Sequence, residues 1–96
     1  MLYKDMGGWF RFYVRGERAE LERFTIELAW YHSALAEVGG VNEMRDNTFV
    51  LNLIAHPENY GDGGNEIVER HLRRLASKFH VVGFATWDEI KERDGA

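Results

Sequence analysis

The chain has 96 residues, 45% of them hydrophobic and 14% aromatic, which suffices for the core of one small domain and excludes a second. The absence of cysteine excludes disulfides and thiolate metal sites, and it makes a cytoplasmic location the expectation. The formal net charge of −4 disfavours sequence-independent binding to nucleic acid, because an excess of Lys and Arg drives that mode.

The N-terminal segment 1–8 ends in two glycines and is expected to be a flexible lead-in. It has no apolar run of the kind found in a targeting signal. No stretch of the chain approaches the ~18 apolar residues that a membrane span needs, so no membrane association is expected.

A strictly alternating segment, 9–15, predicts a strand with two different faces. One face is wholly apolar and suits a core: Phe10, Phe12 and Val14. The other face is aromatic and basic and suits a binding surface: Trp9, Arg11, Tyr13 and Arg15.

Apolar residues recur three and four apart in the next segment and predict a helix from Glu17 to about Val38. The stripe expected to face the core comprises Leu21, Phe24, Leu28, Tyr31 and Leu35. Ile26 and Trp30 fall on the opposite side of the helix, where we expect an exposed apolar patch. The glycine pair after Val38 is expected to end the helix.

Two strand-like segments, 41–45 and 48–55, are joined by Asp-Asn, which suits a two-residue hairpin turn. This turn sets Asn42 opposite Leu51 on the core side of the sheet. The residues that then point away from the core are Val50, Asn52 and Ile54.

The glycine-rich loop 56–65 leads into a second helix, expected from Glu66 to Phe79 with Asn65 as its N-cap. The core stripe of this helix comprises Val68, Leu72, Leu75 and Phe79. A glycine-rich turn before a helix can bind an anion, but acidic neighbours and the lack of a following Gly-Lys-Ser/Thr favour a plain connection.

The last strand is expected over 80–86, with Val82 and Phe84 facing the core. The residues of this strand that then face away from the core are Val81, Gly83 and Ala85. A capping-box spacing that begins at Thr86 predicts a short helix over 87–96.

The order strand, helix, strand, strand, helix, strand over 9–86 resembles the ferredoxin-like βαββαβ fold of the α+β class. The resemblance implies a four-stranded antiparallel sheet in the order 4-1-3-2, with both helices on one face. One core would contain Phe10, Phe12, Leu21, Phe24, Leu28, Leu51, Leu53, Leu72, Leu75 and Phe84. The other face of the sheet would be bare, unless the N-terminal or C-terminal segment folds over it.

The candidate binding residues are the ones on that bare face and on the outer side of the first helix. They are Trp9, Arg11, Tyr13, Arg15, Val50, Asn52, Ile54, Ile26 and Trp30. A contiguous apolar patch marks an interface, and Trp, Tyr and Arg are enriched at the energetic hot spots of interfaces. These residues therefore predict a surface for a protein partner or for a second copy of the chain.

The four histidines, His32, His56, His71 and His80, match no zinc-ligand spacing, so neither a metal nor a cofactor is expected. The predicted topology also puts His56 and His80 at opposite ends of the sheet. No catalytic residue is assigned, because His56 has acidic neighbours but no identifiable nucleophile to act with it.

The sequence therefore favours a small non-enzymatic interaction module or inhibitor. In size and acidic charge the chain resembles inhibitors from phages and mobile elements, among them the anti-CRISPR proteins. One alternative is a small enzyme of the dimeric α+β barrel type with a pocket near His56. Another is an RNA-binding module, because aromatic residues on the central strand resemble those of RNA-recognition motifs, although the predicted third strand lacks their Arg/Lys-Gly-aromatic pattern.

Overall fold

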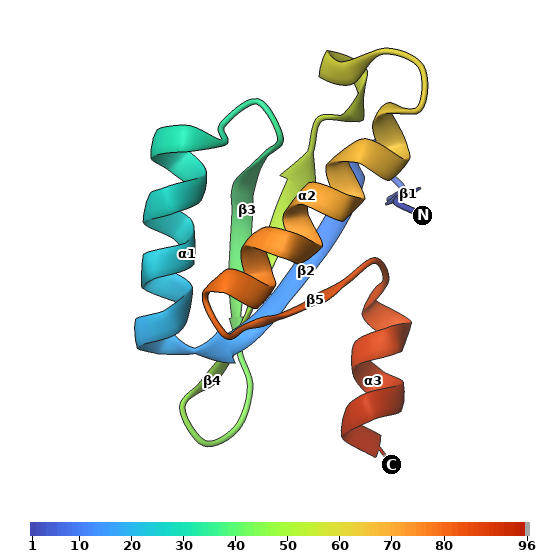
Figure 1. The fold of residues 1–96 in the computed structure, drawn as a ribbon. Coiled ribbons are helices and arrows are strands. Elements are labelled where there is room, and N and C mark those ends of the chain that lie inside the picture. The colour runs from blue at the N-terminus through green and yellow to red at the C-terminus, as the bar shows by residue number, and fades with distance from the viewer. Residues whose placement is uncertain (96) are drawn as a thin grey trace.

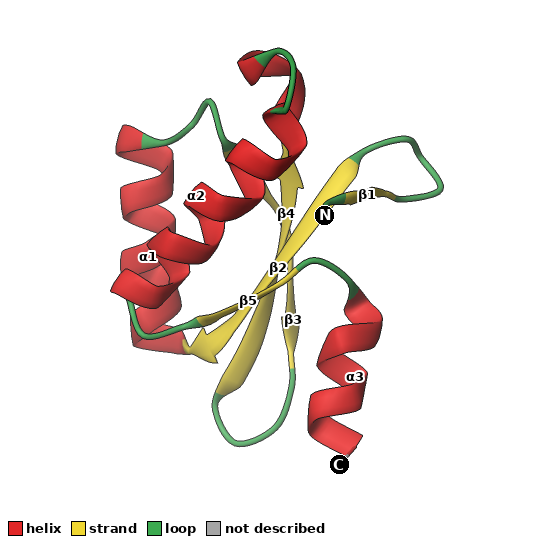
Figure 2. Cartoon of the chain, turned by 45° about the vertical axis from the view of Figure 1, so that its right-hand side comes forward, coloured by secondary structure: helices red, strands yellow, loops and turns green. Residues whose placement is uncertain are grey.

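The computed structural model describes the backbone of residues 1–95 and the side chains of residues 1–92. It confirms the predicted α+β class with an antiparallel sheet (Figure 1). Two α-helices lie on one side of the sheet and a third lies on the other side (Figure 2). No helix in the described part of the chain is long and apolar enough to cross a membrane.

The sheet is built around β2 (Phe10–Glu17). One edge of β2 pairs antiparallel with β4 (Thr48–Ala55), and β4 pairs in turn with β3 (Ala36–Glu43). The other edge pairs with β1 (Tyr3–Lys4) near the start of β2 and with β5 (Val82–Phe84) further along it. The order across the sheet is therefore β5-β2-β4-β3, with β1 on the same edge as β5.

The helices connect these strands in a simple order. Helix α1 (Arg18–Tyr31) follows β2 directly, and α2 (Gly64–Lys78) follows a 3-10 turn, η1 (Pro57–Tyr60). Helix α3 (Trp87–Gly95) ends the described chain. The Thr86 hydroxyl accepts the backbone N–H of Glu89 at 3.2 Å, as the capping-box spacing predicts.

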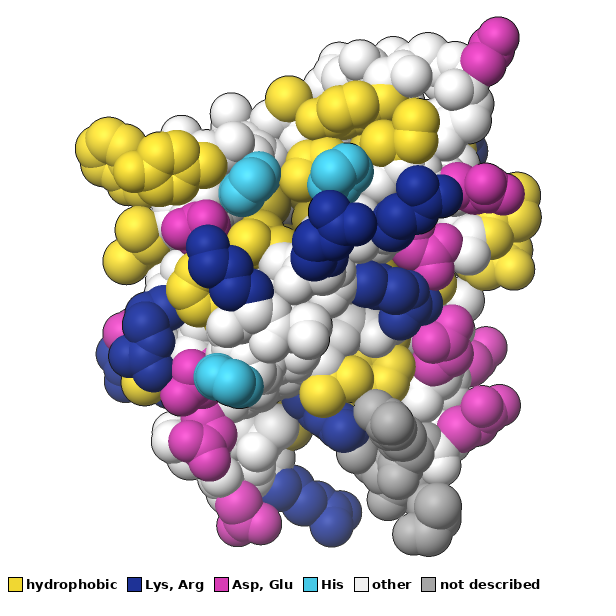
Figure 3. Space-filling view, in the orientation of Figure 1, with side chains coloured by type: hydrophobic (Ala, Val, Ile, Leu, Met, Phe, Trp, Pro, Cys, Tyr) yellow, Lys and Arg dark blue, Asp and Glu magenta, His cyan; other side chains and the backbone are white. Residues whose placement is uncertain are grey.

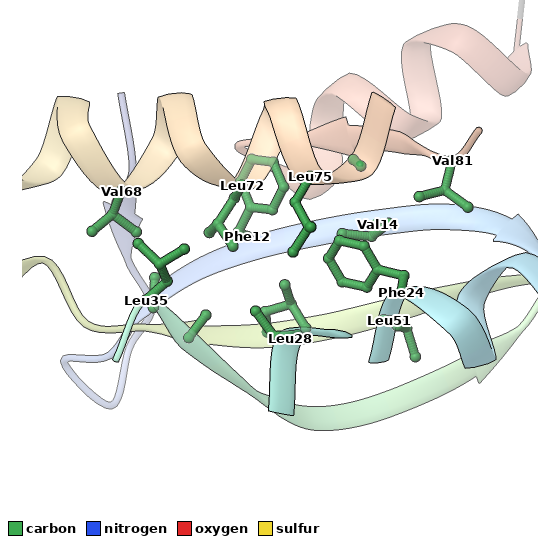
Figure 4. Close-up of a cluster of buried hydrophobic side chains, with 14 of the residues drawn as sticks. Phe12, Val14, Phe24, Leu28, Leu35, Leu51, Val68, Leu72, Leu75 and Val81 are labelled. Carbon is green, nitrogen blue, oxygen red and sulfur yellow. The ribbon is translucent and has the colours of Figure 1, made fainter. Parts of the chain in front are cut away.

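The main core lies between the sheet and the two helices α1 and α2 (Figure 4). Phe12 and Val14 of β2 are fully buried, as are Phe24 of α1 and Leu72 of α2. Leu21, Leu28, Leu51, Leu53 and Leu75 belong to the same core, and Phe10 packs against it while partly exposed. The predicted face of β2 and the predicted stripe of α2 are confirmed.

Helix α1 ends at Tyr31, well before the predicted end at Val38. The N–H of His32 still bonds to the carbonyl of Leu28 at 2.9 Å, after which the chain turns away. Leu35 reaches the core from the following loop, whereas Tyr31 is 76% exposed. The helical spacing of Leu35 therefore led to a wrong prediction of the helix end. The two glycines expected to end the helix lie inside β3 instead.

The register between β3 and β4 also differs from the prediction, because Asn42 lies opposite Val50 and not opposite Leu51. Both turn residues have the expected positive φ, but the N–H of Met44 bonds to the carbonyl of Thr48 at 2.8 Å. This bond shifts the pairing by one residue, and a one-residue shift exchanges the two faces of a strand. Asn42 therefore faces away from the main core.

The faces of β5 are the reverse of those predicted. Phe84 pairs with Tyr13 and lies with it on the side of α3, while Val81 joins the main core. A Cβ atom on Gly83 would lie 2.5 Å from the Phe12 ring, so Gly83 also faces the main core. The prediction failed because α3 supplies Phe84 with a second buried environment that the element order does not reveal.

The start of the segment 1–8, for which a flexible lead-in was expected, is attached to the domain through Leu2 and β1. Leu2 is only 1% exposed, and its backbone N–H and C=O both bond to the Asn65 side chain, at 2.7 and 3.0 Å. Asn65 thus holds the N-terminal segment in place, and the N-cap of α2 is Gly63 instead.

Candidate binding surfaces

The sheet face opposite α1 and α2 is not bare, because α3 covers part of it (Figure 2). Val50, Phe84 and Ile90 form a second buried cluster there, against which Tyr13 and Trp87 pack. Val50 is 0% exposed and so cannot contact a partner in this conformation. The expectation of an open face is wrong in this region, and the alternative that the C-terminal segment folds over it is the arrangement observed.

Tyr13 is a structural residue of this second cluster. Its ring meets that of Trp87 edge to face, with centroids 5.6 Å apart and an interplanar angle of 67°. Burial raises the pKa of the Tyr13 hydroxyl, an effect that the positive charge of Arg11 partly opposes. The ring is therefore partly covered by α3, whereas an RNA-recognition motif stacks bases on open aromatic rings of its sheet.

Arg15, which lies next on the same side of β2, is also engaged within the domain. Its guanidinium carbon lies 5.3 Å from the centre of the Phe84 ring, a cation–π distance. Phe84 itself is buried in the second cluster. The side of β2 near α3 is therefore used for internal packing.

Arg11 lies near the start of β2 and is held by two hydrogen bonds. Its Nε donates to Asp5 at 2.7 Å and its Nη1 donates to Asn52 at 3.1 Å. The backbone N–H of Trp9 and the Arg11 side chain both bond to Asp5 and hold the pKa of that carboxyl below its usual value. A Cβ atom on Gly39 would lie 2.9 Å from Arg11, so the glycine at the bulge of β3 leaves room for the guanidinium.

The part of this sheet face that stays open is small. Trp9 is 53% exposed, while Asn52 and Ile54 are half-buried. Tyr3 of β1 pairs with Arg11 and is 55% exposed on the same face, so the open part carries two accessible aromatic rings, Trp9 and Tyr3. The charge of Arg11 is neutralised there by Asp5. It is a weaker binding surface than the predicted aromatic and basic face.

The outer side of α1 carries the second predicted surface, and it is open. Ile26 is 59% exposed and Trp30 is 77% exposed, as the helical pattern predicts. Tyr31, which the prediction placed in the core, is the last residue of the same helix and is 76% exposed. We call these three residues the α1 patch.

A groove of about 240 Å³ runs between α1 and α2 next to this patch. Its lining, which we call the helix groove, comprises Glu27, His32, Leu35, His71, Arg74, Leu75 and Lys78. Glu27 pairs with Lys78 at 3.0 Å and lies 3.7 Å from His32. In Figure 3 basic and histidine side chains gather over the two helices, and hydrophobic side chains project beyond the C-terminal end of α1.

The remaining predicted site concerns His56, which lies between two carboxylates. Its Nδ1 is 3.2 Å from Glu58 and its Nε2 is 3.6 Å from Glu37. Among the described residues, no group of three or more His, Asp or Glu side chains is arranged to hold a metal ion.

The structure thus divides the predicted binding residues among three environments. Tyr13, Arg15 and Val50 belong to the packing around α3, whereas Trp9, Arg11, Asn52 and Ile54 lie on the open part of the sheet face. Ile26 and Trp30 belong to the α1 patch. Comparison with models of protein families, with curated proteins and with solved structures finds no match for the chain.

Proposed function

We propose that this protein is a non-enzymatic interaction module or inhibitor that binds a protein partner through the α1 patch. The observation that carries the proposal is the exposure of three large apolar side chains in the C-terminal half of α1. These are Ile26, Trp30 and Tyr31, each more than half exposed.

Such a patch exposes apolar surface to water in the free protein, and its burial stabilises a complex. A surface helix usually carries polar side chains on the side away from the core. Burying one large apolar side chain stabilises a complex by roughly 1.5–3 kcal/mol, and Trp and Tyr are among the commonest hot-spot residues. Trp30 and Tyr31 together therefore supply anchors of the kind that protein interfaces use.

The sheet face opposite α1 and α2 supports the proposal by contrast. Two of its aromatic residues, Tyr13 and Phe84, already pack with α3, and Arg11 is already paired with Asp5. Their side chains need no partner to be satisfied. Those of the α1 patch have no equivalent cover in the described part of the chain.

We also propose that the domain is ferredoxin-like, with β1 and α3 added to the βαββαβ unit. The antiparallel pairing β5-β2-β4-β3 and the packing of α1 and α2 on one face support this assignment. In that arrangement α1 lies at the flank of the helical layer, where a partner can reach it without displacing any element.

The test compares the wild type with Ile26→Ser/Trp30→Ser. A matched control is Arg18→Ser/Glu22→Ser, which changes an exposed ion pair at the other end of α1. Recovery of partner protein from a lysate of the source cell, quantified by mass spectrometry, should fall tenfold or more in the first variant only, since one lost hot spot costs ~2 kcal/mol or more.

Sedimentation of the purified proteins checks in parallel whether the partner is a second copy of the chain. Retention of partner binding by Ile26→Ser/Trp30→Ser would show that the α1 patch is not the interface. The proposal is also wrong if the wild type neither self-associates nor recovers any protein.

A further inference from the structure

The helix groove, with Arg74 in its lining and Arg70 one turn before Arg74 on α2, points to the chemistry of the partner. We infer, on the basis of the function proposed above, that the partner presents an acidic peptide segment with interspersed apolar residues. Its carboxylates would bind Arg70 and Arg74, and its apolar side chains would contact the floor of the helix groove and the α1 patch.

Arg70 and Arg74 are the two cations of α1 and α2 that pair with no residue the structure describes. They lie four residues apart on α2, which makes their side chains neighbours, and like charges at this spacing repel each other. Neither guanidinium has a hydrogen bond or ion pair with any residue that the structure describes. A bound anion would remove that repulsion.

The neighbouring basic residues differ in that they are already engaged. Lys78 pairs with Glu27 at 3.0 Å. Arg73 pairs with Glu69 at 2.9 Å and also donates to the carbonyl of Gly83 at 3.0 Å. The capacity to bind an additional anion is therefore concentrated at Arg70 and Arg74.

The floor and the rim of the helix groove have different chemistry. Leu35 and Leu75 on the floor are 5% and 7% exposed, so an apolar side chain could rest there. His71 and Arg74 lie on the rim. Tyr31 follows the groove residue Glu27 by four positions on α1 and so lies beside it, which places the α1 patch at the edge of the groove.

A carboxylate-bearing peptide fits this site better than a nucleic acid does. Strong binding to a phosphate backbone typically uses ~6–10 phosphate contacts, far more than two unpaired arginines can make. The carboxylate of Glu27 inside the groove repels a polyanion, and so does the net charge of −4. Single carboxylates spaced by apolar residues avoid most of this repulsion.

The test measures fluorescence anisotropy of a short fluorescein-labelled peptide of alternating glutamate and leucine, with the intact protein. Arg70→Ser/Arg74→Ser should weaken binding tenfold or more, because two charge-assisted bonds are lost. The control Arg18→Ser/Arg45→Ser removes the same charge from exposed positions outside the groove and should leave binding within about twofold. Thermal unfolding confirms that both variants remain folded.

Three results would overturn the inference: equal weakening in both variants, no binding of the peptide by the wild type, or tighter binding of a labelled oligothymidine than of the peptide. A peptide with lysine in place of glutamate should not bind.

The proposed function fails separately, in the experiment with Ile26→Ser/Trp30→Ser. If that variant loses its partner while the peptide test fails, the α1 patch remains the interface and only the partner chemistry is wrong.

Discussion

The sheet face near α3 and the outer side of α1 both carry an aromatic residue that the sequence predicts to be exposed. Only the aromatic residue on α1 is exposed. Tyr13 packs edge to face on Trp87, whereas Trp30 is 77% exposed. A sheet that has helices on one side still offers a second broad face, on which a helix of the same chain can dock. The outer side of a helix already packed on the sheet offers no such room. An aromatic strand face is therefore weaker evidence for a partner than an aromatic helix surface.

The largest expected effect comes from the main core, which sets the scale for this comparison. Phe12→Ala should reduce the free energy of unfolding by ~3–5 kcal/mol, since Phe12 is 0% exposed and its truncation leaves a cavity. Urea denaturation measures the change. Trp30→Ala is the control and should stay within about 0.5 kcal/mol of the wild type. A loss below about 1 kcal/mol for Phe12→Ala would mean that β2 buries its other face.

The packing of α3 should make the next largest contribution. Ile90 is 1% exposed in the second cluster, so Ile90→Ala should cost ~2–5 kcal/mol. The same denaturation experiment, with hydrogen exchange along α3, checks this value. A loss close to zero would mean that α3 is detached in solution, and the sheet face would then be a candidate surface again.

A smaller effect tests the reversed faces of β5. Gly83→Ala should destabilise the protein by ~1–3 kcal/mol, because the new Cβ would lie 2.5 Å from the Phe12 ring. Gly40→Ala is the matched control, since a Cβ there meets no atom within 4 Å. It should be neutral or slightly stabilising. Similar stability of the two variants would support the predicted faces of β5 over the observed ones.

The smallest effect concerns the open part of the sheet face and depends on pH. Hydrogen bonds from the Trp9 backbone and from Arg11 lower the pKa of Asp5 from its ordinary value of 3.8. Asp5 therefore contributes stability that is fully present above pH 3.8 and is lost as the pH falls through its lower native pKa. Asp5→Asn should be slightly less stable than the wild type at neutral pH, and the two unfolding midpoints should converge in acid. A constant difference at all pH values would contradict this account.

The elements with strong periodicity could be predicted from the sequence. Strand β2 alternates strictly, and α2 places Val68, Leu72 and Leu75 on one stripe, so both were located correctly. The end of α1 could not be located, because Leu35 keeps the helical spacing although it lies in a loop. Local periodicity reports which residues are buried, and it does not report which element buries them.

The errors in β3 and β5 have a different cause. One backbone hydrogen bond, from the N–H of Met44 to the carbonyl of Thr48, shifts the register of β3. The residue types in the turn do not predict this bond. Strand β5 has only three residues, too few for an alternating pattern to decide on which side of the sheet Phe84 is buried. The docking of α3 decides that question through a contact between elements.

The candidate site could be predicted in part. The exposure of Ile26 and Trp30 follows from helical spacing and is confirmed. Tyr31 was missed because the predicted helix continued beyond it. The helix groove was missed because Glu27 and Arg74 come from two helices that are distant in sequence, and only the packing of α1 against α2 brings these side chains together.

The most direct test of the difference between the two aromatic surfaces compares Trp30→Ala with Trp87→Ala, measuring for each the free energy of unfolding and the recovery of partner from the same lysate. Trp30→Ala should keep the stability of the wild type and lose partner recovery tenfold or more, because Trp30 belongs to the α1 patch. Trp87→Ala should lose stability, because Trp87 packs on Tyr13 and the second cluster, while its folded fraction still recovers the partner. The opposite pattern, with binding lost at Trp87 and retained at Trp30, would contradict the assignment of the interface to α1.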